Sequence, residues 1–597
     1  MKITLVELSP TLNGRLFEKP AEDFYSLFKL PSRAIPLLDA ILRREGYSDI
    51  VQINPAFNKT KMITNEEIKR LIESDVVGLS SITRTTPQSY ELARYIKDRN
   101  PNVKIIMGGT HVSMLPDEAL NNHCDIIVRQ EGDITLPEVV RRIQDNPYDP
   151  MLDDVAGISF RKGANGNNGN NGNKSNKGDK ADEVYHNPDR TFLTNEELSA
   201  LPIPNIREIE LKKGNVIPII TSRGCPYKCE YCTVIKNFGT QFRYLDEDSV
   251  IALFEYAKNN YAKKIFVADD SFAANKNRTK RLLHKIIERD MKLPNWSAQV
   301  RVESAFDDEL LSLLRKANCT MVYIGLESFN DATLKLFKKK SNKEKNMEAV
   351  RRYHKHDICV HGMFILGAET DDLQSIRSTL DYAKKLKINT AQFFVLTPLP
   401  GTPLTKRYEE EGRILTKAWH KYDIQRVVID HPTIDAEVLQ REVDELSLKF
   451  YSYPQAIKAL FTGNDKAFDF TMRILGRFLA RKITFKNNKS HYQFLKVIDD
   501  WKHNQRDLFD QWKADINSCF DSETEFKEEE YQNKVKQIIS YLDNVNKILS
   551  NTDVYLYSTY NDIKDYVQYT ISKFKEEANL FIEQLQLQQQ PQPELEA

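Results

Sequence analysis

The chain has 597 residues, of which 41% are hydrophobic and 28% charged, and its 85 basic and 85 acidic residues give no net charge. This length exceeds what one core organises, so two or three domains are expected. The balance of charge gives no general support for nucleic-acid binding, and no apolar run reaches the roughly 18 residues of a membrane span. The first residues, MKITLVEL, lead directly into a strand pattern, and the sequence therefore predicts a cytoplasmic protein.

Residues 1–150 alternate short apolar runs with helical stretches. This order predicts parallel strands joined by crossover helices, in a doubly wound, Rossmann-like sheet that binds its ligand at the carboxyl ends of the strands. Small and hydroxyl-bearing residues at these ends let a ligand approach the backbone, although tight strand-to-helix turns are an alternative reason for the glycines. The candidate cofactor-binding residues here are Ser80, Ser81, Thr83, Gly108, Gly109, His111, Glu131 and Gly132.

Residues 151–205 are predicted to connect the first domain to the next. Within them, residues 163–182 contain no apolar residue larger than alanine, so this insertion is predicted to be disordered. Its flanks, VAGISFRK and DEVYHNP, have the pattern of two strands that can pair. The insertion is therefore expected to be a long hairpin loop.

Residues 206–430 contain strand-like runs separated by helical segments, a pattern typical of a partial (β/α)6 barrel of parallel strands. The runs are 216–222, 264–270, 296–302, 320–328, 358–367 and 391–400. In such a barrel the chemistry gathers where the strands end. The candidate cofactor-binding residues near these ends are Asp269, Asp270, Ser271, Gln299, Arg301, Glu327 and Gly367.

Three of the seven cysteines, Cys225, Cys229 and Cys232, have the spacing C-x3-C-x2-C directly after the first barrel strand. In a reducing compartment such a group is expected to hold metal or perform redox chemistry. Cysteine thiolates hold iron-sulfur clusters, and three ligands to a four-iron cluster leave one iron open. Zinc is the alternative, but a closed zinc site needs a fourth ligand and no Cys or His occurs between 233 and 283.

This spacing, with Tyr231 just before the third cysteine, resembles the signature of the radical S-adenosylmethionine (SAM) superfamily. The segments GLES, GMFILGAETDD and PLPGTPL are similar to those at the fourth, fifth and sixth strands of these enzymes. DVVGLSS, KIIMGGTHVSMLPDEAL and DIIVRQEGDITLPEVV resemble their cobalamin-binding domain. The resemblance covers about residues 1–450 and is to the cobalamin-dependent branch, which includes magnesium-protoporphyrin cyclase, hopanoid methylases and archaeal lipid ring-forming enzymes.

The resemblance implies cofactors and their chemistry. Cys225, Cys229 and Cys232 would ligate three irons of a 4Fe-4S cluster, and SAM would chelate the fourth. Reduction of the cluster would cleave SAM and give a 5'-deoxyadenosyl radical, which takes hydrogen from an unactivated carbon. A ferredoxin or flavodoxin is the expected electron donor.

The resemblance also implies roles for strand-end residues. Asp269, Asp270 and Ser271 would contact the methionine amino group, with a turn or helix cap as the alternative. Glu327 would contact the ribose, with a solvated strand end as the alternative. Gln299 and Arg301 lie on one side of a strand and would face the barrel interior, with an ion pair elsewhere as the alternative for Arg301.

The cobalamin-binding segments depart from the family pattern in one respect. Cobalamin domains that ligate cobalt through histidine carry D-x-H-x-x-G, and no D-x-H occurs in this sequence. His111 lies in GGTHVSML instead and is expected to be a loop residue near the cofactor. Cobalamin is therefore predicted to bind without a histidine ligand to cobalt, and a domain that keeps the fold without the cofactor is the alternative.

Residues 431–597 are predicted to be mainly helical, with a disordered tail and no catalytic motif. They are expected to pack across the barrel mouth or to help hold a long apolar substrate. The segment RFLARKITFKNNK combines basic and apolar residues, so a peripheral membrane contact is an alternative to an ordinary amphipathic helix.

The leading hypothesis is a cobalamin-binding radical SAM enzyme that transfers a methyl group to an unactivated carbon of a lipid or isoprenoid-like substrate. Radical carbon-carbon bond or ring formation on a lipid or tetrapyrrole is the alternative within this class. A non-catalytic iron-sulfur sensor or scaffold is the alternative outside it, but such a protein would not need the polar strand ends.

Overall fold

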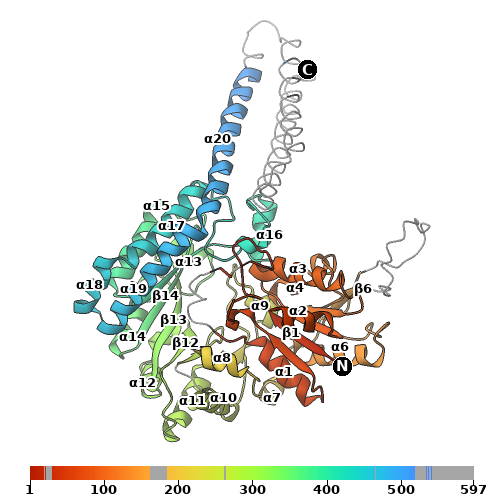
Figure 1. Cartoon of the computed structure of the whole chain (residues 1–597). Helices are drawn as coiled ribbons and strands as arrows, with labels where there is room; N and C mark the ends of the chain where they lie inside the picture. The colour runs from red at the N-terminus through yellow and green to blue at the C-terminus, as the bar shows by residue number, and fades with distance from the viewer. Residues whose placement is uncertain are drawn as a thin grey trace, which may run out of the picture.

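The structure is a computed structural model, and it describes residues 1–18, 20–21, 30–161, 184–214, 216–260, 264–463 and 465–517, with single positions at 533, 536 and 540. The insertion predicted at 163–182 and the predicted C-terminal tail lie outside the described residues. Figure 1 shows two α/β bodies side by side, with C-terminal helices packed on the second of them.

The first body is built on a seven-stranded sheet of order β2-β1-β3-β4-β5-β6-β7. Its strands are β1 (Ile3–Glu7), β2 (Ile50–Ile53), β3 (Val76–Ser80), β4 (Lys104–Gly108), β5 (Ile126–Val128), β6 (Ile158–Arg161) and β7 (Val184–His186). The first five are parallel, and β6 and β7 continue the sheet as an antiparallel pair. The two flanks of the insertion therefore pair as predicted.

Helices cover both faces of this sheet, as expected of a doubly wound fold. They are α1 (Ala34–Arg44), α2 (Asn65–Ile72), α3 (Thr86–Lys97), α4 (Thr110–Met114), α5 (Pro116–Leu120) and α6 (Gly132–Asp145). Two separate apolar clusters result, one that includes Leu92 and Ile96 of α3 and one that includes Leu136 and Val139 of α6. Because the strands are buried on both faces, their sequences are almost entirely apolar.

The second body is a parallel six-stranded sheet of order β15-β14-β13-β12-β11-β8, an open barrel whose edge strands β8 and β15 do not pair. Its strands are β8 (Ile217–Ile219), β11 (Ile265–Val267), β12 (Trp296–Val300), β13 (Cys319–Glu327), β14 (Cys359–Leu366) and β15 (Thr390–Val395). Its outer helices are α10 (Glu247–Asn259), α11 (Lys276–Glu288), α12 (Asp308–Lys316), α14 (Lys343–Lys355) and α15 (Leu373–Lys385). All six predicted strands are present, which confirms the predicted fold class; the exact domain boundaries stay predictions.

Short elements and a helical C-terminal region complete the described chain. The short elements that bear on the site are a two-stranded ribbon of β9 (Ser222–Arg223) and β10 (Arg243–Tyr244) and the helices α9 (Val234–Phe238), α13 (Asp331–Leu336) and α16 (Pro403–Glu410). Helices α17 (Ala436–Phe450), α18 (Tyr453–Thr462), α19 (Lys466–Lys482) and α20 (Lys489–Asn517) follow, with a π-helix at Ile483–Asn487. Helix α17 packs on β15 and α15, and α20 extends away from the body (Figure 1).

Candidate functional site

One cavity of about 1380 Å³ is shared by the two α/β bodies. On one side it is lined by the carboxyl ends of β1, β3, β4 and β5, and on the other by inward-facing side chains of all six barrel strands. Single ligand pockets usually occupy about 300–1,000 Å³. The cavity therefore has room for more than one ligand, and it joins the binding edge of the first sheet to the interior of the barrel.

Most of the strand-end residues predicted in the first body lie on this cavity. The lining residues are Ser80, Ser81, Gly108, Gly109, Glu131 and Gly132. Gly109 has φ +114°, and a Cβ there would lie 2.2 Å from the Ser81 carbonyl oxygen, so only glycine fits where the two strand ends meet. Thr83 is not among the lining residues.

His111 lies outside the cavity lining, in a contact between the first body and the segment after the barrel. Its Nε2 lies 3.2 Å from Glu118 Oε1, and its ring packs edge-on against Trp419 at 5.0 Å. The Trp419 indole N–H also donates to Glu118, at 3.0 Å. Only 1% of His111 is exposed, so its surroundings are those of a packing residue.

The three motif cysteines occupy the loop between β9 and α9. Gly224, which precedes them, has φ +82°, and a Cβ there would lie 2.3 Å from the Gln241 carbonyl oxygen. The loop turns where the Cys232 N–H donates to the Cys229 carbonyl oxygen, at 3.2 Å. Burial raises the pKa of Cys225, and it raises that of Cys232 to about 12. Without a positive partner or a metal, these thiols therefore stay protonated.

A positive charge lies directly beside one of these cysteines. Arg301 Nη1 is 3.8 Å from Cys229 Sγ, and the guanidinium stacks 3.6 Å above the ring of Tyr227. Glu303 Oε1 accepts from Arg301 Nη2 at 3.1 Å and fixes this orientation. Arg301 thus faces the cysteine loop and places a positive charge beside it.

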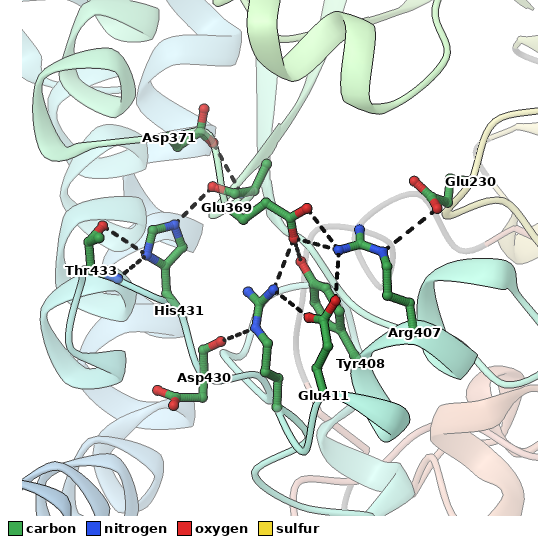
Figure 2. Close-up of polar contacts among 11 residues, drawn as sticks. Glu230, Glu369, Asp371, Arg407, Tyr408, Glu411, Asp430, His431 and Thr433 are labelled. Atoms are coloured by element: carbon green, nitrogen blue, oxygen red, sulfur yellow. Dashed lines mark hydrogen bonds and ion pairs between the residues drawn. The ribbon is translucent and has the colours of Figure 1, made fainter. Parts of the chain in front are cut away.

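Helix α16 contacts the cysteine loop through Glu230, which Figure 2 shows beside Arg407. The Leu404 N–H donates to the Glu230 carbonyl oxygen at 3.3 Å, and Arg407 Nε lies 3.8 Å from Glu230 Oε1. Arg407 is held in turn by Glu369, which also accepts from Arg413 at 2.9 Å. Burial alone would raise the pKa of Glu369, but these hydrogen bonds lower it below its usual value. The position of the loop therefore depends on residues more than 100 positions away.

Glu327 lies under the same loop and not on the cavity. It has φ +61°, a left-handed conformation uncommon for a residue with a side chain, and its Oε1 accepts from Lys339 Nζ at 2.6 Å. Beside it, Tyr231 of the motif packs edge-on against Phe337 at 4.9 Å. Glu327 is thus a buried, ion-paired residue next to the motif, and its contact with a ribose stays a prediction.

The adjacent residues Asp269 and Asp270 have different surroundings. Asp269 is buried and accepts hydrogen bonds from the backbone N–H and hydroxyl of both Thr221 and Ser222, at 2.6–3.2 Å. Asp270 lines the cavity, and burial followed by repulsion from Asp269 raises its pKa to about 6. Asp269 therefore fastens β8 to β11, whereas Asp270 is available to a ligand; the buried Ser271 does not line the cavity.

This difference predicts opposite effects of two substitutions. Asp269→Ala should lower the free energy of unfolding by about 3–5 kcal/mol, because it leaves the buried Arg278 without its nearby carboxylate. Asp270→Ala should leave the protein at least as stable as wild type, because it removes a buried carboxyl whose pKa is raised, and should weaken SAM binding if Asp270 contacts SAM as expected. Thermal unfolding and equilibrium dialysis with labelled SAM measure the two effects, and an Asp269→Ala protein as stable as wild type would contradict the assignment.

The middle of the barrel is lined by uncharged polar side chains. The register places Gln299, Tyr323, His361 and Thr390 side by side on four neighbouring strands. His361 Nδ1 lies 2.7 Å from Thr390 Oγ1, and its Nε2 lies 3.2 Å from Gln392 Oε1. Gln299 thus faces the interior as predicted from its strand position. Gly367, by contrast, packs under Leu439 of α17 and does not line the cavity.

His361 should make the protein sensitive to acid. Burial lowers its pKa to about 4, whereas an unfolded histidine has its usual pKa of about 6.5. The unfolded chain therefore binds this proton first, and stability should fall as the pH drops from about 6.5 to 4, by about 3 kcal/mol for this residue. Across this range the melting temperature should fall with pH less steeply for His361→Gln than for wild type. The exposed control His503→Gln should show the wild-type slope. Equal slopes for wild type and His361→Gln would refute this prediction.

A buried cluster of four charges joins the root of the cysteine loop to the first body. Arg223 of β9 donates to both oxygens of Asp133, at 2.7 and 2.9 Å, and to Glu131 at 3.2 Å. Arg243 of β10 donates to Glu131 at 2.9 Å. Burial alone would raise the pKa of Asp133, but Arg223 lowers it. Sequence analysis missed this pairing, although Arg223, next to the motif, and Asp133, next to a predicted ligand-binding turn, are both visible in the sequence.

The donor set fits the predicted cofactors. Three thiols lie on one loop beside Arg301, Asp270 lies between that loop and the barrel interior, and the glycine-containing strand ends of the first sheet face the same cavity. In the described residues, no three His, Cys, Asp or Glu side chains converge on a single metal ion. A four-iron cluster does not require such convergence, because each of its cysteines binds a different iron.

Sequence comparisons give the same division of the chain. A model of the radical SAM superfamily matches residues 219–383, and a model of the B12 binding domain matches residues 26–140. An uncharacterised methyltransferase of Pyrococcus horikoshii is 27% identical over 72% of this chain and 86% of its own length. The bacteriochlorophyllide d C-12(1)-methyltransferase of Chlorobaculum tepidum is 26% identical over 65% of this chain and 76% of its own length. The anaerobic magnesium-protoporphyrin IX monomethyl ester cyclase of Rubrivivax gelatinosus is 22% identical over 75% of this chain and 79% of its own length.

Solved structures share the fold. The cobalamin-dependent SAM radical enzyme OxsB, with aqua-cobalamin and SAM bound, has a TM-score of 0.60 at 17% identity and covers 90% of this chain and 83% of its own. The radical SAM methyltransferase TsrM from Kitasatospora setae, with cobalamin and a [4Fe-4S] cluster bound, has a TM-score of 0.58 at 15% identity and covers 81% and 100%.

The two bodies, their shared cavity and the cysteine loop define a radical SAM protein with an N-terminal B12-binding domain. The prediction made from the motifs is confirmed at this level. The chain thus carries both domains, and it is similar to methyltransferases and to a magnesium-protoporphyrin cyclase over most of its length.

Proposed function

We propose that this protein is a cytoplasmic methyltransferase that acts on an unactivated carbon of a lipid or isoprenoid-like substrate. Cys225, Cys229 and Cys232 would hold a 4Fe-4S cluster, Asp270 would contact SAM, and the strand ends of the first sheet would hold cobalamin. When bound, these cofactors supply reductive cleavage of SAM to a 5'-deoxyadenosyl radical and a methyl group carried on cobalt, with electrons from a ferredoxin or flavodoxin.

The observation that carries this proposal is the shared cavity. A methyl group carried by one cofactor reaches a carbon activated by another only if both open onto the substrate, and the ends of the first sheet and the barrel interior line one space. The similarity to the methyltransferases of Pyrococcus horikoshii and Chlorobaculum tepidum supports methyl transfer, and the similarity to the cyclase keeps ring formation as the alternative.

The residues of the chain would position the reactants and keep water out. Arg301 would place a positive charge beside the cysteine loop, and the network around Glu369 would hold the loop in place. Burial lowers the pKa of His361 to about 4, so at neutral pH His361 presents no charge to a substrate. We also propose that cobalamin has no histidine ligand here, because the histidines on the cavity in the described chain, His354 and His361, belong to the barrel side.

The test is anaerobic reconstitution with iron, sulfide and hydroxocobalamin, followed by reduction with dithionite in the presence of methyl-labelled SAM and a lipid extract. Retained cobalamin, 5'-deoxyadenosine and label in a lipid would support the proposal. 5'-Deoxyadenosine with a ring-closed, unlabelled product would favour the cyclase alternative. An intact cluster that never cleaves SAM would favour a sensor or scaffold.

A further inference from the structure

Helices α18 and α19 and the π-helix after them carry several large apolar side chains that are exposed. The set is Tyr453, Ile457 and Phe461 on α18 and Ile474, Phe478 and Phe485 after it, and these side chains are between 37% and 74% exposed. The two helices pack against each other, and α18 lies at the edge of the molecule farthest from the B12-binding domain (Figure 1). We call this set the exposed apolar face. Several exposed large apolar side chains on two packed helices indicate an interaction surface more strongly than scattered single residues do.

The charges around the exposed apolar face are almost all positive. Residues 453–489 contain eight Lys and Arg and two Asp, in a chain with no net charge. Of these, Arg473 and Asp469 are both buried, and Asp465 caps the N-terminus of α19, so seven Lys and Arg and one Asp remain outside the core. Apolar and aromatic side chains bordered by Lys and Arg are the composition of helices that lie in the surface of an anionic bilayer.

The shared cavity reaches the same helix. Phe468 and Met472 of α19 line its far end, at the amino-terminal side of the barrel strands, with Lys264, Ile358 and Cys359. Three positions further along the helix, Thr471 and Leu475 are exposed. Residues three apart are neighbours on a helix surface. The far end of the cavity and the exposed apolar face therefore occupy adjoining strips of α19.

We propose that the exposed apolar face lies in the surface of an anionic lipid bilayer and that the substrate passes from the bilayer into the barrel past Phe468 and Met472. Entry would then be at the end of the barrel opposite the cluster loop. No helix in the described residues is long and apolar enough to cross a membrane, so the contact would be in the plane of the surface. The docking is argued from the surface alone, whereas the entry route rests on the proposed function.

The experiment is co-sedimentation of the full-length reconstituted protein with phosphatidylglycerol and with phosphatidylcholine vesicles. We expect wild type to bind the anionic vesicles more tightly, and to bind them less at high salt. Phe461→Ser together with Phe478→Ser should weaken binding at least about tenfold, because two aromatic anchors are lost. The control is Tyr148→Ser, which removes an aromatic side chain that is 77% exposed, in the first body, and should bind as wild type does.

Three results would overturn the proposal. The first is that wild type sediments with neither kind of vesicle, and the second is that the double variant sediments as wild type does. The third is that light scattering shows a wild-type dimer that the same two substitutions dissociate, because a second copy of the chain would then cover the exposed apolar face. Circular dichroism confirms that the variants fold. Absence of 5'-deoxyadenosine from the wild-type protein would count against the proposed function and leave the sedimentation result unaffected.

Discussion

Cys229→Ala should leave a folded protein that makes no 5'-deoxyadenosine after anaerobic reconstitution and reduction. The substitution removes one of three thiols and the one nearest to Arg301. A four-iron cluster held by two cysteines loses the geometry that leaves a single iron open to SAM. We therefore expect a complete loss of SAM cleavage, measured by chromatography of the products, and a reduced cluster absorbance.

The matched control for this variant is Cys124→Ala. Cys124 is a buried cysteine that packs in the apolar cluster of the first body, far from the motif in sequence. Its loss should reduce stability slightly and leave SAM cleavage intact. SAM cleavage at the wild-type rate by Cys229→Ala would refute the assignment of the cluster ligands.

Arg223→Met should strongly reduce stability and should also release cobalamin. Asp133 would remain buried without its partner, whereas Glu131 would keep Arg243, and removing one member of a buried ion pair costs about 3–5 kcal/mol. Both acids flank Gly132 at the cavity, so their rearrangement would distort the binding edge of the first sheet. Chemical denaturation and the cobalamin absorbance of the desalted protein measure the two losses.

A double-mutant cycle distinguishes this pairing from a general packing effect. Adding Asp133→Leu to Arg223→Met should cost less than the sum of the single changes, because the second substitution removes the unpaired charge. Arg142→Met is the control, since Arg142 pairs with Asp154 at the surface of the same body. Surface pairs contribute little. Additive losses in the cycle would show that Arg223 and Asp133 are not coupled.

The architecture was predictable because the strands of both sheets are buried. Runs such as ITLVE of β1 and CTMVYIGLE of β13 are mostly apolar, and each is followed by a helical segment. The cysteine motif was equally visible, since its ligands lie within one loop and do not depend on tertiary contacts. Local spacing therefore determined the fold class and the cluster loop.

Contacts between distant segments could not be predicted in this way. Asp269 and Asp270 are neighbours, and only the structure shows that the first points into Thr221 and Ser222 and the second into the cavity. His111 was expected near a cofactor from its place in a glycine-containing turn, yet its partner Trp419 is about 300 residues away. The charge cluster around Arg223 likewise joins residues about 90 apart. A single sequence holds no signal for such pairs.

The open barrel has one further consequence. Because β8 and β15 do not close on each other, the strands fix the width of the cavity but not its depth. The end of the cavity at the amino-terminal side of the strands, where we propose that the substrate enters, is formed in part by Phe468 and Met472, on a helix outside the sheet. A methionine is unbranched and adapts to its surroundings at little cost. Two side chains of α19 thus help to shape the proposed entrance, and a relative could admit a wider or narrower substrate by changing them, with the cysteine loop and the strand ends of the first sheet left in place.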